Sequence, residues 1–105
     1  MGMVTIVRYR PKAGKDADLV ALVGDHLRIL QEERLATDRP PIIMRAANGD
    51  ILEAFEWISP EAIEQAHQNP SVNALWARFA VACEYQPLAS LEECQQLFAS
   101  FEAIN

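Results

Sequence analysis

The 105-residue sequence predicts a single α+β domain that follows the ferredoxin-like order β-α-β-β-α-β, with an added C-terminal helix. Three observations support this fold class. Residues 3–10 alternate in polarity as a strand does, residues 16–35 carry a wide apolar stripe at helical spacing, and Asn48-Gly49 separates two short apolar runs. A domain of this class has an antiparallel sheet with helices on one face.

Four strands are expected. Asn48-Gly49-Asp50 between apolar runs favours a tight hairpin, because asparagine and glycine both tolerate the positive φ that such a turn needs. Pro87 lacks a backbone N–H and places the last strand at an edge of the sheet. The expected strands are residues 3–10, 42–47, 51–58 and 84–88.

Four helices are expected. Ser59 and Asn69 are good N-cap residues, and each is followed by a proline at the first helical position, where a missing N–H costs nothing. Ser90 and Glu93 form a capping box that predicts a helix at the C-terminal end. The expected helices are residues 16–35, 60–68, 70–82 and 90–105.

Composition excludes several classes of partner. The chain has 9 basic and 15 acidic residues and a formal charge of −6, which argues against nucleic acid or an anionic membrane surface. No apolar run approaches the roughly 20 residues of a membrane span, and no signal peptide is recognisable, so we expect a cytoplasmic protein. Cys83 and Cys94 lack metal-ligand spacing and are expected to be reduced thiols, with a disulfide as the alternative.

The strands also predict a homodimer. Helices cover one face of the sheet, yet the third strand is apolar on both sides, with Phe55 and Trp57 on one and Leu52, Ala54 and Ile58 on the other. The sheet of a second copy would cover the open face, since each large buried side chain contributes roughly 1.5–3 kcal/mol. The alternative is a monomer in which the C-terminal helix covers that face.

The run from Glu53 to Trp76 resembles a known family. Its parts are an aromatic-ended strand, EAFEW, then SPEAIEQAH with Ala66-His67 at its end, then NPSV before an aromatic residue. On these motifs the chain, over roughly Val4 to Tyr85, resembles the antibiotic biosynthesis monooxygenase-like group of the dimeric α/β-barrel superfamily.

The resemblance implies two facing sheets and a pocket between sheet and helices in each protomer. It implies no cofactor and no metal, because some members oxidise polycyclic aromatics with dioxygen alone. Other members isomerise small metabolites, degrade haem or have no known reaction, and fold-level analogy does not choose among them. Haem degradation is set aside, because the asparagine, tryptophan and histidine positions of that branch are not matched here. The leading hypothesis is a cofactor-independent monooxygenase for an aromatic or quinol-type ligand; the alternative is a non-catalytic binding or structural module.

Two histidines are the candidate catalytic residues. His67 exchanges a proton near neutral pH and suits deprotonation of a phenol or enol. The alternative is a helix-terminal histidine that binds the last carbonyl groups of its helix. His26 lies at the border of the first apolar stripe, facing the pocket or hydrogen-bonded to backbone.

Five further residues are candidates for ligand binding. Trp57, Trp76, Phe79 and Tyr85 have the flat apolar surfaces of an aromatic pocket, although such residues at these spacings also form ordinary cores. Arg45 would stabilise an enolate oxygen, with a cross-strand ion pair as the alternative.

Overall fold

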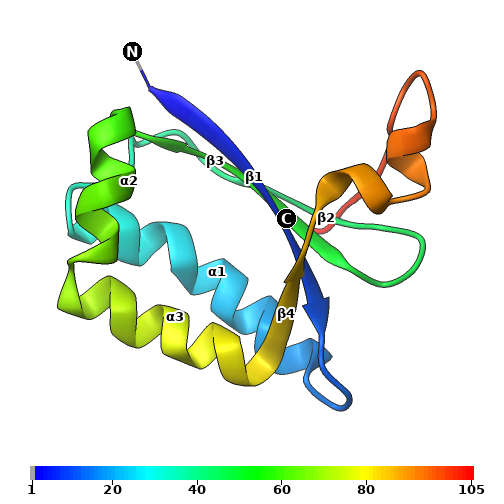
Figure 1. The fold of residues 1–105 in the computed structure, drawn as a ribbon, viewed down its shortest axis with the longest axis horizontal. Coiled ribbons are helices and arrows are strands. Elements are labelled where there is room, and N and C mark those ends of the chain that lie inside the picture. Colours follow the sequence, from blue (N-terminus) through cyan, green and yellow to red (C-terminus); the bar gives the residue numbers. More distant parts are fainter. Residues whose placement is uncertain (1) are drawn as a thin grey trace.

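The computed structural model describes residues 2–105 and shows an α+β fold with a five-stranded antiparallel sheet and three α-helices (Figure 1). The strand order is β4-β1-β3-β2-β5, which is compatible with the predicted ferredoxin-like arrangement. None of the helices in this part of the chain is long and apolar enough to cross a membrane. The elements are β1 (Met3–Pro11), α1 (Asp16–Glu32), β2 (Ile42–Arg45), β3 (Ile51–Trp57), α2 (Pro60–His67), α3 (Pro70–Ala82), β4 (Cys83–Gln86) and β5 (Glu102–Ala103).

The predicted hairpin and both cap-plus-proline helix starts are confirmed. β2 pairs antiparallel with β3, and Gly49 takes a φ of 95° in the turn between them. Asn48 keeps a negative φ, and its side chain accepts a hydrogen bond from the Asp50 N–H, so the connection is wider than a two-residue turn. The Ser59 and Asn69 side chains accept hydrogen bonds from the third residue of α2 and α3 respectively.

The helices all lie on one side of the sheet (Figure 1). β1 runs antiparallel between β3 and β4, with Val7 opposite Glu53 and Tyr9 opposite both Ile51 and Tyr85. Odd-numbered residues of β1 and β3 therefore point toward the helices, and the main core forms there. The largest fully buried side chains on this side are Tyr9, Leu19, Leu30, Ile51, Glu53 and Phe79.

The predicted C-terminal helix over residues 90–105 is wrong. Short 3-10 turns occupy Leu88–Ser90 and Glu93–Gln95, and the chain then ends in β5, which pairs with β2. The Glu93 carboxylate does not close a capping box; it accepts a hydrogen bond from the Ala47 N–H in the β2–β3 turn. Burial of Leu91 against the sheet and the edge pairing of β5 outweigh the local helix signals.

The expected apolar face of that helix is likewise not formed. The side chains of Leu97 and Phe98 are 93% and 83% exposed. Leu91 instead packs with Ala46 and Leu52 into a small cluster on the side of the sheet away from the helices. The C-terminal segment therefore covers only part of that face.

Arg8 joins this segment to the sheet. Its guanidinium is buried and binds the Asp50 carboxylate, with 2.7 Å between Nε and Oδ2. The same group donates to the Pro87 carbonyl at 2.8 Å and to the Ser90 hydroxyl at 2.7 Å. A buried guanidinium needs such partners, because an unpaired charge in the interior is costly.

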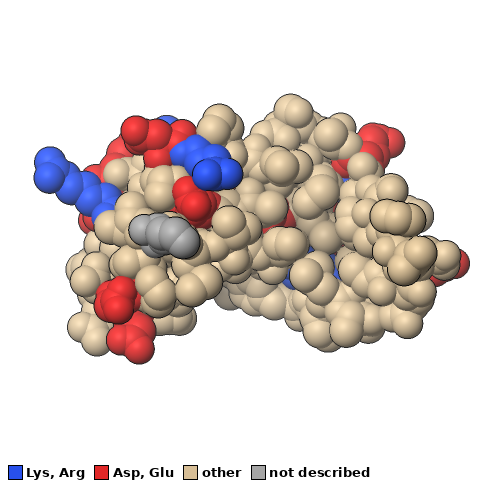
Figure 2. Space-filling model, turned by 90° about the horizontal axis from the view of Figure 1, so that it is seen from above, with Lys and Arg blue, Asp and Glu red and all other residues tan. Residues whose placement is uncertain are grey.

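The rest of the outer face contains an open apolar strip. Ile6 and Ile42 both pair with Ala54 of β3 and lie on either side of it, 49% and 56% exposed, and Val4 is 57% exposed. Seen from above in Figure 2, this side of the molecule carries few charged side chains over its centre. From the sequence, we expected either a second copy of the chain or a C-terminal helix to cover this face.

We expect Asp50→Ala to lower the free energy of unfolding by about 3–5 kcal/mol, because it leaves the buried Arg8 guanidinium without its carboxylate. Urea denaturation of both proteins measures the difference. Asp16→Ala is the matched control, since Asp16 pairs with the more exposed Arg45 and its loss costs at most about 1 kcal/mol. Equal effects of the two substitutions would contradict this assignment.

Candidate functional site

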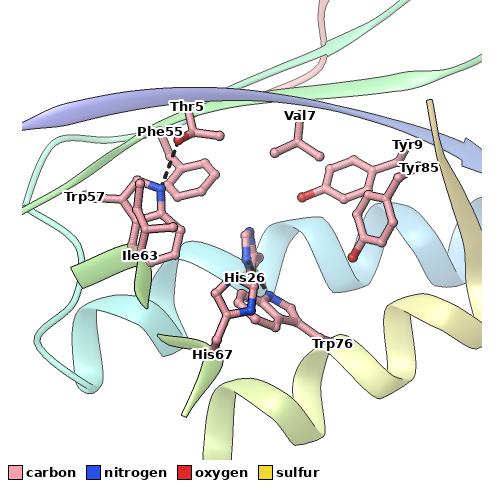
Figure 3. A pocket seen from close by; sticks show the side chains of 10 residues that line it. All are labelled: Thr5, Val7, Tyr9, His26, Phe55, Trp57, Ile63, His67, Trp76 and Tyr85. Carbon is pink, nitrogen blue, oxygen red and sulfur yellow. Dashed lines mark hydrogen bonds between the residues drawn. The ribbon is translucent and has the colours of Figure 1, made fainter. Parts of the chain in front are cut away.

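A pocket of about 440 Å³ lies between the helix-facing side of the sheet and helices α1, α2 and α3 (Figure 3). This volume is in the range that small-molecule sites occupy. Its lining is mostly aromatic or aliphatic, with a few polar groups. The lining residues are Thr5, Val7, Tyr9, His26, Phe55, Trp57, Ile63, His67, Trp76 and Tyr85.

One end of the pocket is a fixed aromatic wall. The Trp57 indole donates from Nε1 to the Thr5 hydroxyl at 3.0 Å, a contact drawn in Figure 3. The Phe55 ring lies beside it, with 5.2 Å between ring centroids. This hydrogen bond satisfies the indole N–H and leaves its apolar surface available to a flat ligand.

Three polar groups meet under the pocket floor. The Glu53 carboxylate is fully buried on β3, and its Oε1 lies 2.8 Å from the Tyr9 hydroxyl and 2.8 Å from His26 Nδ1. These contacts join β1, β3 and α1 at one oxygen atom. The second oxygen, Oε2, has no hydrogen-bond partner among the described residues.

Trp76 lies close to both histidines. Its Nε1 is 3.5 Å from His26 Nε2, and its ring centroid is 4.9 Å from that of His67. His26 is buried at the floor of the pocket, whereas His67 is exposed at its mouth. The structure thus brings the two histidines to one pocket, where both lie close to the same indole (Figure 3).

The hydrogen bonds around His26 define where its proton lies. An indole nitrogen only donates, so Nε2 of His26 is an acceptor toward Trp76. The other nitrogen, Nδ1, then carries the hydrogen and donates it to Glu53. A histidine held in this way has a lone pair on the side of Trp76 and the pocket.

Both tyrosines of the pocket remain protonated over a wide pH range. Burial, followed by the charge and hydrogen bond of Glu53, raises the pKa of Tyr9 well above its usual value. Tyr85 is 55% exposed as a whole; its partial burial, followed by the charges of Cys83 and Glu53, raises its pKa to about 12. The two hydroxyls therefore act as neutral groups near pH 7.

The structure places five of the predicted site residues in the pocket lining: His67, His26, Trp57, Trp76 and Tyr85. His26 binds a side-chain carboxylate and not the backbone. Phe79 lies beneath the floor, fully buried, stacked on Tyr9 at 5.1 Å between centroids. Arg45 is not brought to the pocket; it pairs with Asp16 at 3.0 Å.

Sequence reasoning did not single out Glu53 or Tyr9. A signal for Glu53 was present, because strand alternation places it with Phe55 and Trp57 on the side that faces the helices. A carboxylate on a buried strand face needs an explanation. For Tyr9 the alternation indicated only a buried ring, not a hydrogen bond.

Comparisons with known proteins give no assignment. No protein-family model matches the chain, and no curated protein is significantly similar to it. Within residues 2–105, no group of three or more histidine, cysteine, aspartate or glutamate side chains is arranged to hold a metal ion.

We expect the folded protein to form almost no tyrosinate at pH 10, because the pKa of Tyr85 is raised to about 12 and that of Tyr9 well above its usual value. In urea both tyrosines titrate near pH 10. Since the unfolded chain loses these protons first, stability is retained below about pH 10 and falls as pH rises toward 12. Absorbance at about 295 nm follows the ionisation.

Tyr85→Phe is the matched variant for this titration. It removes the transition near pH 12 and leaves only that of Tyr9. A tyrosinate signal near pH 10 from folded protein would show that water reaches these hydroxyls freely.

Proposed function

We propose that the protein is a homodimer of facing sheets that binds a flat apolar or aromatic ligand in this pocket and acts as a cofactor-independent monooxygenase on an aromatic or quinol-type substrate. The observation that carries the proposal is the convergence of His26 and His67 on one aromatic-walled pocket. The two unpaired thiols, Cys83 and Cys94, suit a reducing cytoplasmic location, which belongs to the same proposal.

The proposed reaction begins with removal of a proton. A histidine takes the hydroxyl proton of a phenol or enol, and the electron-rich anion that remains reacts with dioxygen. For a carbon that carries two hydrogens, such as the CH₂ of anthrone, both C–H bonds and the O–O bond are broken. One oxygen atom becomes the carbonyl oxygen, and the other leaves as water. The substrate supplies all four electrons.

The geometry gives the two histidines different positions for this chemistry. His26 is buried, hydrogen-bonded to a carboxylate and faces Trp76, which is how a base is held in many active sites. His67 is exposed, and its ring lies tilted against the same indole, with 4.9 Å between ring centroids. His67 suits exchange of the proton with solvent, and both are retained as catalytic candidates.

A homodimer is supported by the open outer face. Val4, Ile6 and Ile42 form an apolar surface beside the part that the C-terminal segment already covers. These side chains are already about half buried, so covering each with a second sheet contributes roughly 1 kcal/mol, about half of the value for complete burial. In the dimer that we propose, the two outer faces meet and the helices and pockets lie outside.

One observation favours the alternative of a non-catalytic binding module. Both ring nitrogens of His26 already have partners within the chain, Glu53 and Trp76. A histidine with both nitrogens engaged is explained by structure alone. The competing function is therefore binding of an aromatic ligand without turnover.

Oxygen uptake with anthrone or a naphthohydroquinone distinguishes the two functions. We expect the wild type to consume dioxygen, and His26→Ala to lose about 100-fold or more, because general bases contribute about 10²–10⁴. His67→Ala should lose less. Gln68→Ala is the control, since Gln68 neighbours His67, is exposed and does not line the pocket. Uptake that is negligible and equal in all four proteins would refute the monooxygenase.

Sedimentation velocity tests the dimer. We expect the wild type to sediment at twice 11.8 kDa. Ile6→Asp should weaken association by at least about 100-fold, because an unpaired carboxylate buried in an apolar interface costs several kcal/mol. Val81→Asp is the control, since Val81 is also exposed and apolar but lies on α3. A wild-type monomer at micromolar concentration would contradict the proposed assembly.

A further inference from the structure

We infer that Glu53 is a positioning residue that holds His26 with its proton on Nδ1, so that Nε2 is the base for a hydroxyl group on the bound ligand. The inference rests on the proposed function, because it names the atom that removes the proton. It also narrows the ligand to aromatic molecules that carry an acidic hydroxyl group, such as phenols and naphthols.

The burial of Glu53 is energetically unfavourable. The side chain is fully excluded from solvent, and only one of its two oxygens has hydrogen-bond partners among the described residues. A buried carboxylate costs several kcal/mol unless its partners compensate, and an apolar residue of similar volume is often as good or better for stability. Packing alone therefore does not account for a glutamate at this position.

The directions of the hydrogen bonds around Glu53 and His26 indicate one tautomer of the imidazole. The Tyr9 hydroxyl and His26 Nδ1 both lie 2.8 Å from Glu53 Oε1. A carboxylate accepts hydrogen bonds, so both groups donate to it. On the far side of the ring, the Trp76 N–H donates toward Nε2. Two contacts on opposite sides of the imidazole thus define the same tautomer.

Nε2 is available to a ligand because its present partner is weakly held. At 3.5 Å the contact with Trp76 is at the long limit of a hydrogen bond, whereas an O–H···N contact with a ligand would be shorter and stronger. Both His26 and Trp76 line the pocket, so a ligand hydroxyl can approach the same nitrogen. The aromatic body of the ligand would then lie against Phe55 and Trp57.

The same arrangement stabilises the product of proton transfer. The proton leaves the ligand oxygen, binds Nε2 and converts the ring to an imidazolium that still donates from Nδ1 to Glu53. The negative carboxylate lies next to the new positive charge and favours it. Tyr9 does not compete for the proton, because its hydroxyl already donates to Glu53 and its pKa is raised.

NMR of protein labelled with ¹⁵N-histidine tests the inference without any turnover. The chain contains two histidines, so the exposed His67 is replaced by alanine and His26 gives the only signal. We expect Nδ1 to be protonated and Nε2 unprotonated. Addition of 1-naphthol should shift the Nε2 resonance, and naphthalene, which lacks the hydroxyl, should shift it much less.

Two further variants separate positioning from packing. Glu53→Leu removes the acceptor, and we expect a mixture of tautomers and naphthol binding weakened by about 10-fold, the equivalent of one good hydrogen bond. Tyr9→Phe is the matched control, because it removes the other donor to the same oxygen and leaves the contact with His26 in place. Its tautomer should remain that of the parent protein.

A proton on Nε2 in the parent protein would overturn the inference, even if Glu53→Leu failed to fold. An unchanged Nδ1–H tautomer in a folded Glu53→Leu protein would overturn it as well. If the tautomer and the naphthol shift are as expected but no oxygen uptake is found, the proposed monooxygenase fails and the role of Glu53 in positioning His26 stands.

Discussion

The contact on which the site depends is the burial of one carboxylate in the middle of the sheet. Glu53 Oε1 binds the Tyr9 hydroxyl and His26 Nδ1, and so it joins β1, β3 and α1 at a single atom. Because a buried charge is stable only with its partners in place, this contact adds to the apolar packing of Leu19, Leu22 and Val23 in holding α1 on the sheet. The position of α1 in turn determines where His26 meets the pocket and Trp76.

The two faces of the sheet bury their apolar side chains against different parts of the chain. The helices cover the inner face and leave a hollow, whereas the outer face is covered only in part by the C-terminal segment, which Arg8 and Leu91 hold in place. The apolar strip at Ile6 and Ile42 remains open. In the dimer that we propose, a second copy of the chain would cover this strip.

Signals that act within a few residues were readable from the sequence. The turn at Gly49 and the caps at Ser59 and Asn69 formed as predicted, since each depends on local backbone chemistry. The helix predicted from the C-terminal capping box did not form, because the burial of Leu91 and the pairing of β5 depend on tertiary contacts that a local signal does not contain. Likewise, His26 and His67 were recognised singly, but their approach to one indole depends on how three helices pack.

Glu53 is the clearest exception to the pattern of apolar residues on the inner face of the sheet. We take this exception as a sign of function. Its neighbours on the inner face are apolar, and local preference, burial and packing all favour an apolar residue there. Natural sequences break such consistency mainly at functional sites, where stability is lost for another gain. Here the gain is a buried imidazole with a defined tautomer under an aromatic pocket. That arrangement matches the role that we infer for Glu53, which is to keep Nε2 of His26 ready for a hydroxyl group on a ligand.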